Sequence, residues 1–142
     1  KKDFDGLKKV AHQSSKMIFL ATLPLVLVFF VFPEFLLGLF GEEFKVGVKA
    51  FVFLSFGKLI SSLSGSVGNI LQMTGKQVIF MNVLFVGAIV NVLLNFFLIP
   101  KFGINGAALA SMISLSMWNL IMVYFVKREF GFYTFYIPFL KR

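Results

Sequence analysis

The sequence contains no cysteine, one histidine and only six acidic residues among its 142 positions. Without cysteine, neither a disulfide nor a thiolate metal site can form, and the redox state of the compartment cannot be read. The single histidine, His12, has no neighbour in the sequence pattern that would make it a general base or a metal ligand. No GxxxxGKS/T phosphate loop, GxSxG nucleophile turn or HExxH helix occurs. We therefore expect a protein that is not an enzyme and that carries no metal and no cofactor.

Apolar residues dominate instead, at 58% of the chain with 21 phenylalanines. Charged residues make up 14%, against roughly 25% in soluble domains. A helix needs about 20 apolar residues to cross a bilayer core about 30 Å thick. The stretches that satisfy this length are Met17–Phe40, Val46–Met73, Val78–Ile99 and Ile104–Val126. The sequence predicts an all-α membrane protein, a polytopic bundle of four transmembrane helices.

The segments outside these spans divide the chain into three parts. Residues 1–16 carry apolar side chains at helical spacing between lysines, which fits either an amphipathic helix on the inner leaflet or a solvated linker. Residues 17–126 hold the four spans, and residues 127–142 form an aromatic tail or the start of a further span. The chain begins with KKDFDGLKK, with neither Met nor an early apolar run, so we expect no cleavable signal peptide and a piece of a longer protein.

The net charge of +8 follows the alternation of loops and does not gather in one basic patch. Eight basic residues fall on one side of the predicted membrane: Lys1, Lys2, Lys8, Lys9, Lys16, Lys76, Lys127 and Arg128. Three fall on the other: Lys45, Lys49 and Lys101. The positive-inside rule then places the N-terminus and the turn at residues 74–77 in the cytoplasm, and Glu34–Lys45 and Pro100–Asn105 outside. The excess charge thus predicts a multi-pass protein of the cytoplasmic membrane with no nucleic-acid partner.

The second predicted span carries polar residues at spacings of three or four: Ser55, Lys58, Ser62, Ser66 and Asn69. On one continuous helix these residues share a face about 80° wide. A lysine in the middle of a span costs roughly 2.5–3.5 kcal/mol, a cost that falls if it faces a water-filled cavity. Lys58 then suits an anionic substrate such as a phosphate or pyrophosphate headgroup. The alternative is a lysine that extends toward the interface or pairs with an acid elsewhere.

The third and fourth spans hold amides and small residues. Asn91 and Asn95 share one helix face, where they can hydrogen-bond between helices or line a cavity. A row of small residues allows a neighbouring helix to approach the fourth span closely: Gly106, Ala110 and Ser114. Trp118 and Asn119 lie deep in the same span, in the core or in a cavity.

Two segments resemble the signatures of a known family. Leu39–Phe44, LFGEEF, resembles the LLFG-x-x-Y turn of polysaccharide flippases, with Phe44 where tyrosine is common. Asn91, Asn95 and the segment IPKFGINGAALAS that ends at Ser111 are similar to the N-x-x-x-N and IP-x-Y/F-G-x-x-GAA-x-A-T/S signature of the same family. These are the Wzx-type transporters of the polysaccharide-transport group, in the superfamily that includes the MATE exporters. The resemblance extends over roughly Met17 to Gly131.

The resemblance implies 12 to 14 spans in two six-helix lobes around a cavity, of which this chain supplies the ninth to twelfth. It implies a flippase that moves an undecaprenyl-pyrophosphate-linked oligosaccharide across the membrane by alternating access, as other repeat-built transporters do. Its partners are then membrane lipids and the N-terminal lobe of the same protein. The substrate contacts that we expect are Lys58, Ser55, Ser62, Ser66 and Asn69, with Asn91 and Asn95 as further lining.

Three other functions remain open at this point. A MATE-type cation exporter requires acids in the cavity, whereas the charge in the middle of a span is a lysine. A membrane-bound polymerase or ligase of surface glycans requires a large outer loop with catalytic residues, and the outer loops here are short. A non-transporting assembly protein has no need for Lys58.

Overall fold

The computed structural model describes residues 4–135, and within this range the chain is helical with no strand. Four long helices form the body of the molecule: α1 (Phe4–Val31), α3 (Val48–Ser64), α5 (Gln77–Phe102) and α6 (Ile104–Phe130). Three short elements connect them: α2 (Pro33–Gly38), the 3-10 helix η1 (Glu42–Gly47) and α4 (Val67–Met73). All four long helices, the second counted together with η1, are long and apolar enough to span a membrane. The predicted all-α membrane bundle is confirmed.

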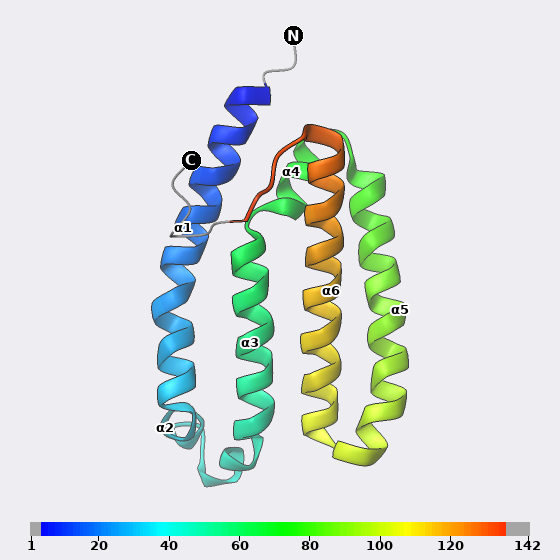
Figure 1. Ribbon diagram of the computed structural model, residues 1–142. Helices are drawn as coiled ribbons and strands as arrows, with labels where there is room; N and C mark the ends of the chain where they lie inside the picture. Colours follow the sequence, from blue (N-terminus) through cyan, green and yellow to red (C-terminus); the bar gives the residue numbers. More distant parts are fainter. Residues whose placement is uncertain (1–3, 136–142) are drawn as a thin grey trace.

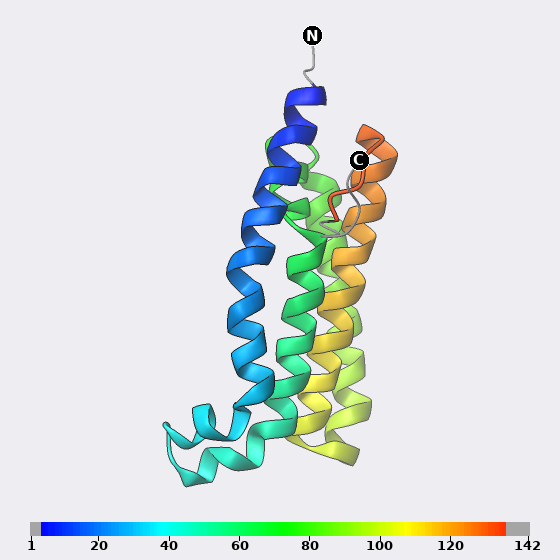
Figure 2. The same ribbon diagram turned by 60° about the vertical axis from the view of Figure 1, so that its left-hand side comes forward.

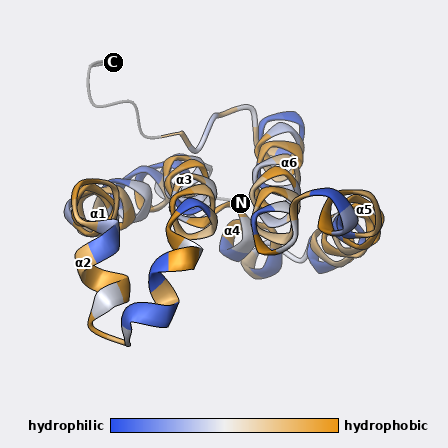
Figure 3. Ribbon diagram, turned by 90° about the horizontal axis from the view of Figure 1, so that it is seen from below, coloured by the Kyte–Doolittle hydropathy of each residue, from blue (hydrophilic) through white to orange (hydrophobic). Residues whose placement is uncertain are grey.

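The long helices stand side by side in one row, in the order α1, α3, α6, α5 (Figure 1). Helix α6 packs against both α3 and α5, while α1 packs against α3. Seen along the helix axes, the row curves so that α5 lies on the same side as α2 and η1 (Figure 3). A single row leaves two broad faces of the bundle uncovered by this chain. Many large apolar side chains on these faces are exposed, as expected where lipid or another part of a longer protein covers them.

The seam between α5 and α6 depends on small residues, as the sequence predicts. Ala110 and Ser114 are almost completely buried there. A Cβ on Gly106 would lie 2.3 Å from the main-chain oxygen of Leu98. The close approach of the two helices therefore requires glycine at this position. The turn between them is also tighter than predicted, because α5 continues through Pro100 and only Gly103 separates it from α6.

The prediction that Val46–Met73 forms one helix is wrong. Helix α3 ends at Ser64, Gly65 adopts φ 75° and ψ −148°, and α4 begins at Val67. This φ value favours glycine, because a Cβ is disfavoured in the left-handed region. The side chain of Ser15 in α1 also occupies the space beside Gly65, because a Cβ on Gly65 would lie 2.7 Å from the Cβ of Ser15. The break thus allows α1 to pack closely against the end of α3.

The first span is also shorter than the predicted Met17–Phe40. Helix α1 ends at Val31, because Pro33 lacks an N–H group and begins a new helix. From there α2 and η1 form a bent connection, here called the elbow (residues 33–47), that projects away from the row (Figures 2 and 3). The elbow therefore changes the direction of the chain within the segment that hydropathy assigns to the first two spans.

The predicted boundaries at residues 16 and 127 do not correspond to breaks in the structure. Residues 4–16 are helical, but they form the first half of α1 and not a separate element. Helix α6 continues to Phe130 and is capped by Gly131. The following residues pack against the bundle, where Phe132 and Thr134 are buried. The rest of the predicted tail, residues 136–142, lies outside the described residues.

The two ends of the bundle differ in packing. The start of α1, the turn at residues 74–76 and the end of α6 lie at one end, here called the amino end, and the elbow and Gly103 lie at the other (Figure 1). This grouping agrees with the predicted loop alternation, while the side of the membrane stays a prediction. Buried apolar side chains gather toward the amino end: Ala11, Val67, Ile70, Leu71, Val83, Met122, Val123, Val126 and Phe132. A salt bridge of 2.6 Å between Lys76 and Glu129 joins the turn before α5 to the end of α6 there. The elbow end is left more open.

Candidate functional site

Two adjoining hollows lie along α6. The outer hollow, of about 670 Å³, lies between the elbow, α3 and the first half of α6. The inner hollow, of about 580 Å³, lies between α3, α6 and α5. They share Leu54 and Ser111, and the α6 residues that line them recur at spacings of three or four: Ala107, Ser111, Leu115 and Trp118. This spacing defines one face of α6, so the hollows form one continuous groove.

Lys58 lines the inner hollow from α3. Its side chain is exposed, and within the part of the chain that the structure describes it forms no salt bridge. The other lining residues are apolar except Asn91 and Ser111. An ammonium group beside an open hollow can meet an anionic group on a bound molecule near the middle of the predicted span.

The other polar residues of the second span do not line the groove. The Oγ of Ser55 donates a 2.8 Å hydrogen bond to the main-chain oxygen of Phe51, one turn earlier in the helix. Ser62 is buried, and its Oγ has no hydrogen-bond partner. Ser66 is buried before the first residue of α4, and Asn69 is exposed on α4 beyond the break at Gly65. The expected single polar face is therefore wrong, because the helix that would present it is interrupted.

Asn91 and Asn95 form a hydrogen-bond chain between α5 and α6. The Nδ2 of Asn95 donates to the Oδ1 of Asn91 at 2.9 Å, and the Nδ2 of Asn91 donates to the Oγ of Ser114 at 3.2 Å. Ser114 in turn donates to the main-chain oxygen of Ala110 at 2.7 Å. Asn91 also lines the inner hollow. The pair thus links two helices, and only Asn91 is in a position to contact a molecule in the groove.

Sequence reasoning missed most of the groove residues of α6 and of the elbow. Trp118 lines the inner hollow and packs on Gly87, where a Cβ would lie 2.4 Å from its ring. Asn119, in contrast, is buried and donates to the main-chain oxygen of Leu115 at 2.8 Å. The sequence left Trp118 open between core and cavity, and the regular spacing of the α6 face was the signal that could have assigned it to the groove. In the elbow, Glu43 and Phe44 line the outer hollow, which no local pattern indicates.

Metal chemistry finds no support in this region. Between residues 4 and 135, no three His, Cys, Asp or Glu side chains lie close enough together to hold a metal ion. The arrangement offers a groove with mainly apolar walls, one ammonium group in its inner hollow and one carboxylate in the elbow. Such a groove is suited to binding an elongated molecule.

Comparison with known proteins assigns the family. The MatE family matches residues 1–97 of this chain. The chain belongs to the MatE family. Over 128 residues it is 30% identical to an uncharacterized membrane protein, MJ1068, of Methanocaldococcus jannaschii. The matched region covers 87% of this chain and 25% of that protein.

A second relative carries a functional name. Over 127 residues the chain is 24% identical to the probable low-salt glycan biosynthesis flippase Agl15 of Haloferax volcanii. This matched region covers 89% of this chain and 27% of that protein. The chain therefore spans about a quarter of the length of these two relatives. No solved structure matches it. Both relatives are membrane proteins by name or function, in agreement with the four apolar helices of the MatE chain described here.

Proposed function

We propose that this MatE chain is part of a flippase that moves a lipid-linked oligosaccharide across the cytoplasmic membrane by alternating access. The substrate that we expect is an undecaprenyl-pyrophosphate-linked repeat unit for surface polysaccharide biosynthesis. The observation that carries the proposal is the position of Lys58, a cation without a salt bridge among the described residues, in a groove between apolar helices. The relationship to a probable glycan biosynthesis flippase supports the same substrate class.

The energetics favour an anionic ligand at Lys58. An unpaired lysine near the middle of a span costs roughly 2.5–3.5 kcal/mol even on the lenient insertion scale. A groove that admits water lowers this cost, and a phosphate group in the groove adds a favourable charge interaction. Lysine binds phosphate as a point charge, without the fixed geometry of arginine. This tolerance suits a headgroup that must be released after it has crossed the membrane.

The proposed partners follow from the single row of helices. One row cannot enclose a cavity, so the groove needs a second wall. We propose that the N-terminal lobe of the same longer protein supplies this wall and that lipids cover the opposite face. Apart from Lys58, the basic residues of the described range lie in the first half of α1, near the ends of the other long helices or in their connections, and we propose no nucleic-acid partner.

The test replaces Lys58 in the full-length protein with alanine, arginine and glutamate. Each variant is expressed in a flippase-deficient strain, and surface polysaccharide is measured at matched protein levels. We expect the alanine and glutamate variants to lose most of the polysaccharide and the arginine variant to keep part of it. Lys101→Ala is the matched control, because Lys101 lies at the end of α5 and does not line either hollow. Normal polysaccharide in all Lys58 variants would contradict the proposal.

A second candidate function is the export of lipophilic cations. It is favoured by Glu43, whose carboxylate lines the outer hollow beside Phe44. An exporter would protect a sensitive strain from a lipophilic cation, and Glu43→Gln would abolish that protection. Lys58 in the same groove disfavours this function, because it repels a bound cation.

A further inference from the structure

The LFG turn places two chemically different side chains at the mouth of the groove. Gly41 adopts φ 132° and ψ 153° before η1, and its main-chain oxygen accepts a 3.1 Å hydrogen bond from the N–H of Phe44. A side chain at position 41 would strain this turn, which explains a glycine in the motif. The chain leaves the turn with Glu43 and Phe44 lining the outer hollow. The motif therefore has a local structural role that ends at the groove.

The two neighbouring acids of η1 have different environments. Glu42 forms a 2.7 Å salt bridge with Lys45 and does not line the hollow. Glu43 lines the hollow and has no salt bridge within residues 4–135. The carboxylate of Glu43 is thus an acceptor that is available to a molecule in the groove.

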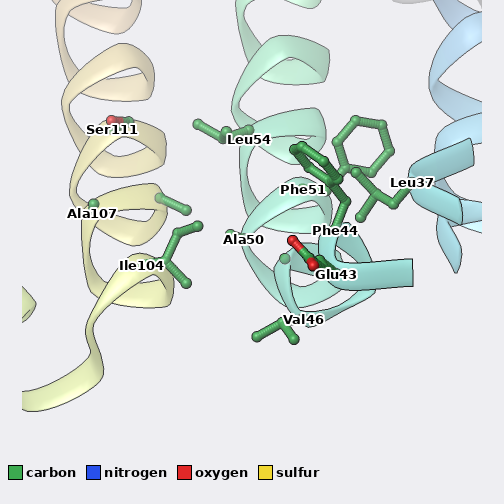
Figure 4. A pocket seen from close by; sticks show the side chains of 12 residues that line it. Leu37, Glu43, Phe44, Val46, Ala50, Phe51, Leu54, Ile104, Ala107 and Ser111 are labelled. Atoms are coloured by element: carbon green, nitrogen blue, oxygen red, sulfur yellow. The ribbon is translucent and has the colours of Figure 1, made fainter. Parts of the chain in front are cut away.

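The walls of the outer hollow combine aromatic and small side chains. Phe44 of the elbow and Phe51 of α3 line one side of the hollow, and Ala107 and Ser111 of α6 line the other (Figure 4). Aromatic faces offer a flat apolar surface to the C–H face of a sugar ring. A carboxylate accepts short, strong hydrogen bonds from hydroxyl groups. This combination of a few polar groups and a mainly apolar wall is typical of ligand sites that orient their ligand.

Charge and distance decide which part of the ligand lies where. Helix α3 rises 1.5 Å per residue, so Lys58 lies roughly 15 Å along the axis from Val48, where α3 leaves the elbow. Glu43 repels a phosphate group, and Lys58 attracts it. A neutral sugar chain attached to a phosphate therefore fits the groove in one direction, with its hydroxyls toward Glu43.

We propose that Glu43 and Phe44 form a sugar subsite, so that the lipid-linked oligosaccharide binds with its pyrophosphate at Lys58 and its sugars at the elbow. This inference rests on the proposed function and adds to it the orientation of the headgroup. It also gives the aromatic residue of the LFG turn a role in binding.

The test measures the affinity of the purified full-length protein, in lipid nanodiscs, for two probes. One probe is polyprenyl pyrophosphate, and the other is the same lipid with its oligosaccharide attached. We expect Glu43→Gln and Phe44→Ala to weaken binding of the glycosylated lipid roughly five- to tenfold and to leave the bare lipid unchanged. Lys58→Ala should weaken both. The matched control Glu42→Gln should change neither, because an exposed ion pair contributes little.

The outcomes separate the two proposals. If Lys58→Ala weakens both probes while Glu43→Gln and Phe44→Ala weaken neither, the sugar subsite is wrong and the flippase proposal stands. Equal losses for both probes in Glu43→Gln would also overturn the subsite. If the wild-type protein binds neither probe, both proposals fail. If Glu43→Gln instead abolishes binding of a lipophilic cation and leaves the glycolipid unaffected, the subsite is wrong and the export function gains support.

Discussion

The seam between α5 and α6 gives the sharpest stability prediction. Gly106→Ala adds one methyl group whose carbon would lie 2.3 Å from the main-chain oxygen of Leu98 and 2.6 Å from its carbon. Ordinary contact distances require the helices to separate by roughly 1 Å. Both neighbours are main-chain atoms, so no side-chain rotation can relieve the clash.

Two opposing effects decide the size of the change. Alanine in place of glycine gains up to about 1 kcal/mol in helix propensity and chain entropy. Overpacking of a close contact costs typically 1–3 kcal/mol, and separating the helices also weakens the partly buried hydrogen bond from Asn91 to Ser114. The loss exceeds the gain, and we expect a net destabilisation of about 1–2 kcal/mol.

The assay is thermal unfolding of the full-length protein in detergent, with Gly47→Ala as the matched control. Gly47 has φ −82°, and a Cβ there would contact nothing within 4 Å. We expect a lower midpoint for Gly106→Ala and an unchanged midpoint for Gly47→Ala. Equal midpoints for the two variants would refute the argument that the seam requires glycine.

Two further substitutions test the polar links and the helix break. Asn91→Leu removes the donor to Ser114 and leaves Asn95 without its acceptor, so we expect it to destabilise the protein by about 1–3 kcal/mol. The same unfolding assay measures this change, and a midpoint like that of the wild type would contradict the role of Asn91 as a link. Gly65→Ala places a Cβ 2.7 Å from the Cβ of Ser15, at a residue whose φ of 75° disfavours a side chain. We expect this change to destabilise the protein by at least about 2 kcal/mol and to increase proteolysis between α3 and α4. Unchanged cleavage there would show that α1 can move aside.

The sequence was sufficient for those features that depend on local composition. Apolar length predicts the four long helices, and the loop charges predict which connections share an end. The small residues at Gly106, Ala110 and Ser114 predict the close seam because their spacing repeats on one helix face. Each of these features can be read from neighbours in the chain.

The break and the elbow depend on distant residues and could not be read in this way. Apolar and small residues continue through Gly65, and the requirement for a glycine comes partly from Ser15, fifty positions earlier. Hydropathy likewise continues past Pro33, so a length criterion extends the first span into the elbow. In the site, the lysine was identifiable because a charge in an apolar run is conspicuous. Glu43 was not, because an acid in a loop lines a hollow only when the loop folds back against α3 and α6.

The order of the helices in the row also has an evolutionary consequence. Helix α6 has neighbours on both sides, and 33% of its apolar window is buried within the chain, against 11% for α5 at the edge of the row. A substitution in α6 must satisfy α3, α5 and the groove together, whereas most positions of α5 need only stay apolar. Among relatives, we expect α5 to exchange one apolar residue for another freely and α6 to change slowly. Differences in ligand preference should then arise mainly where α6 faces the elbow.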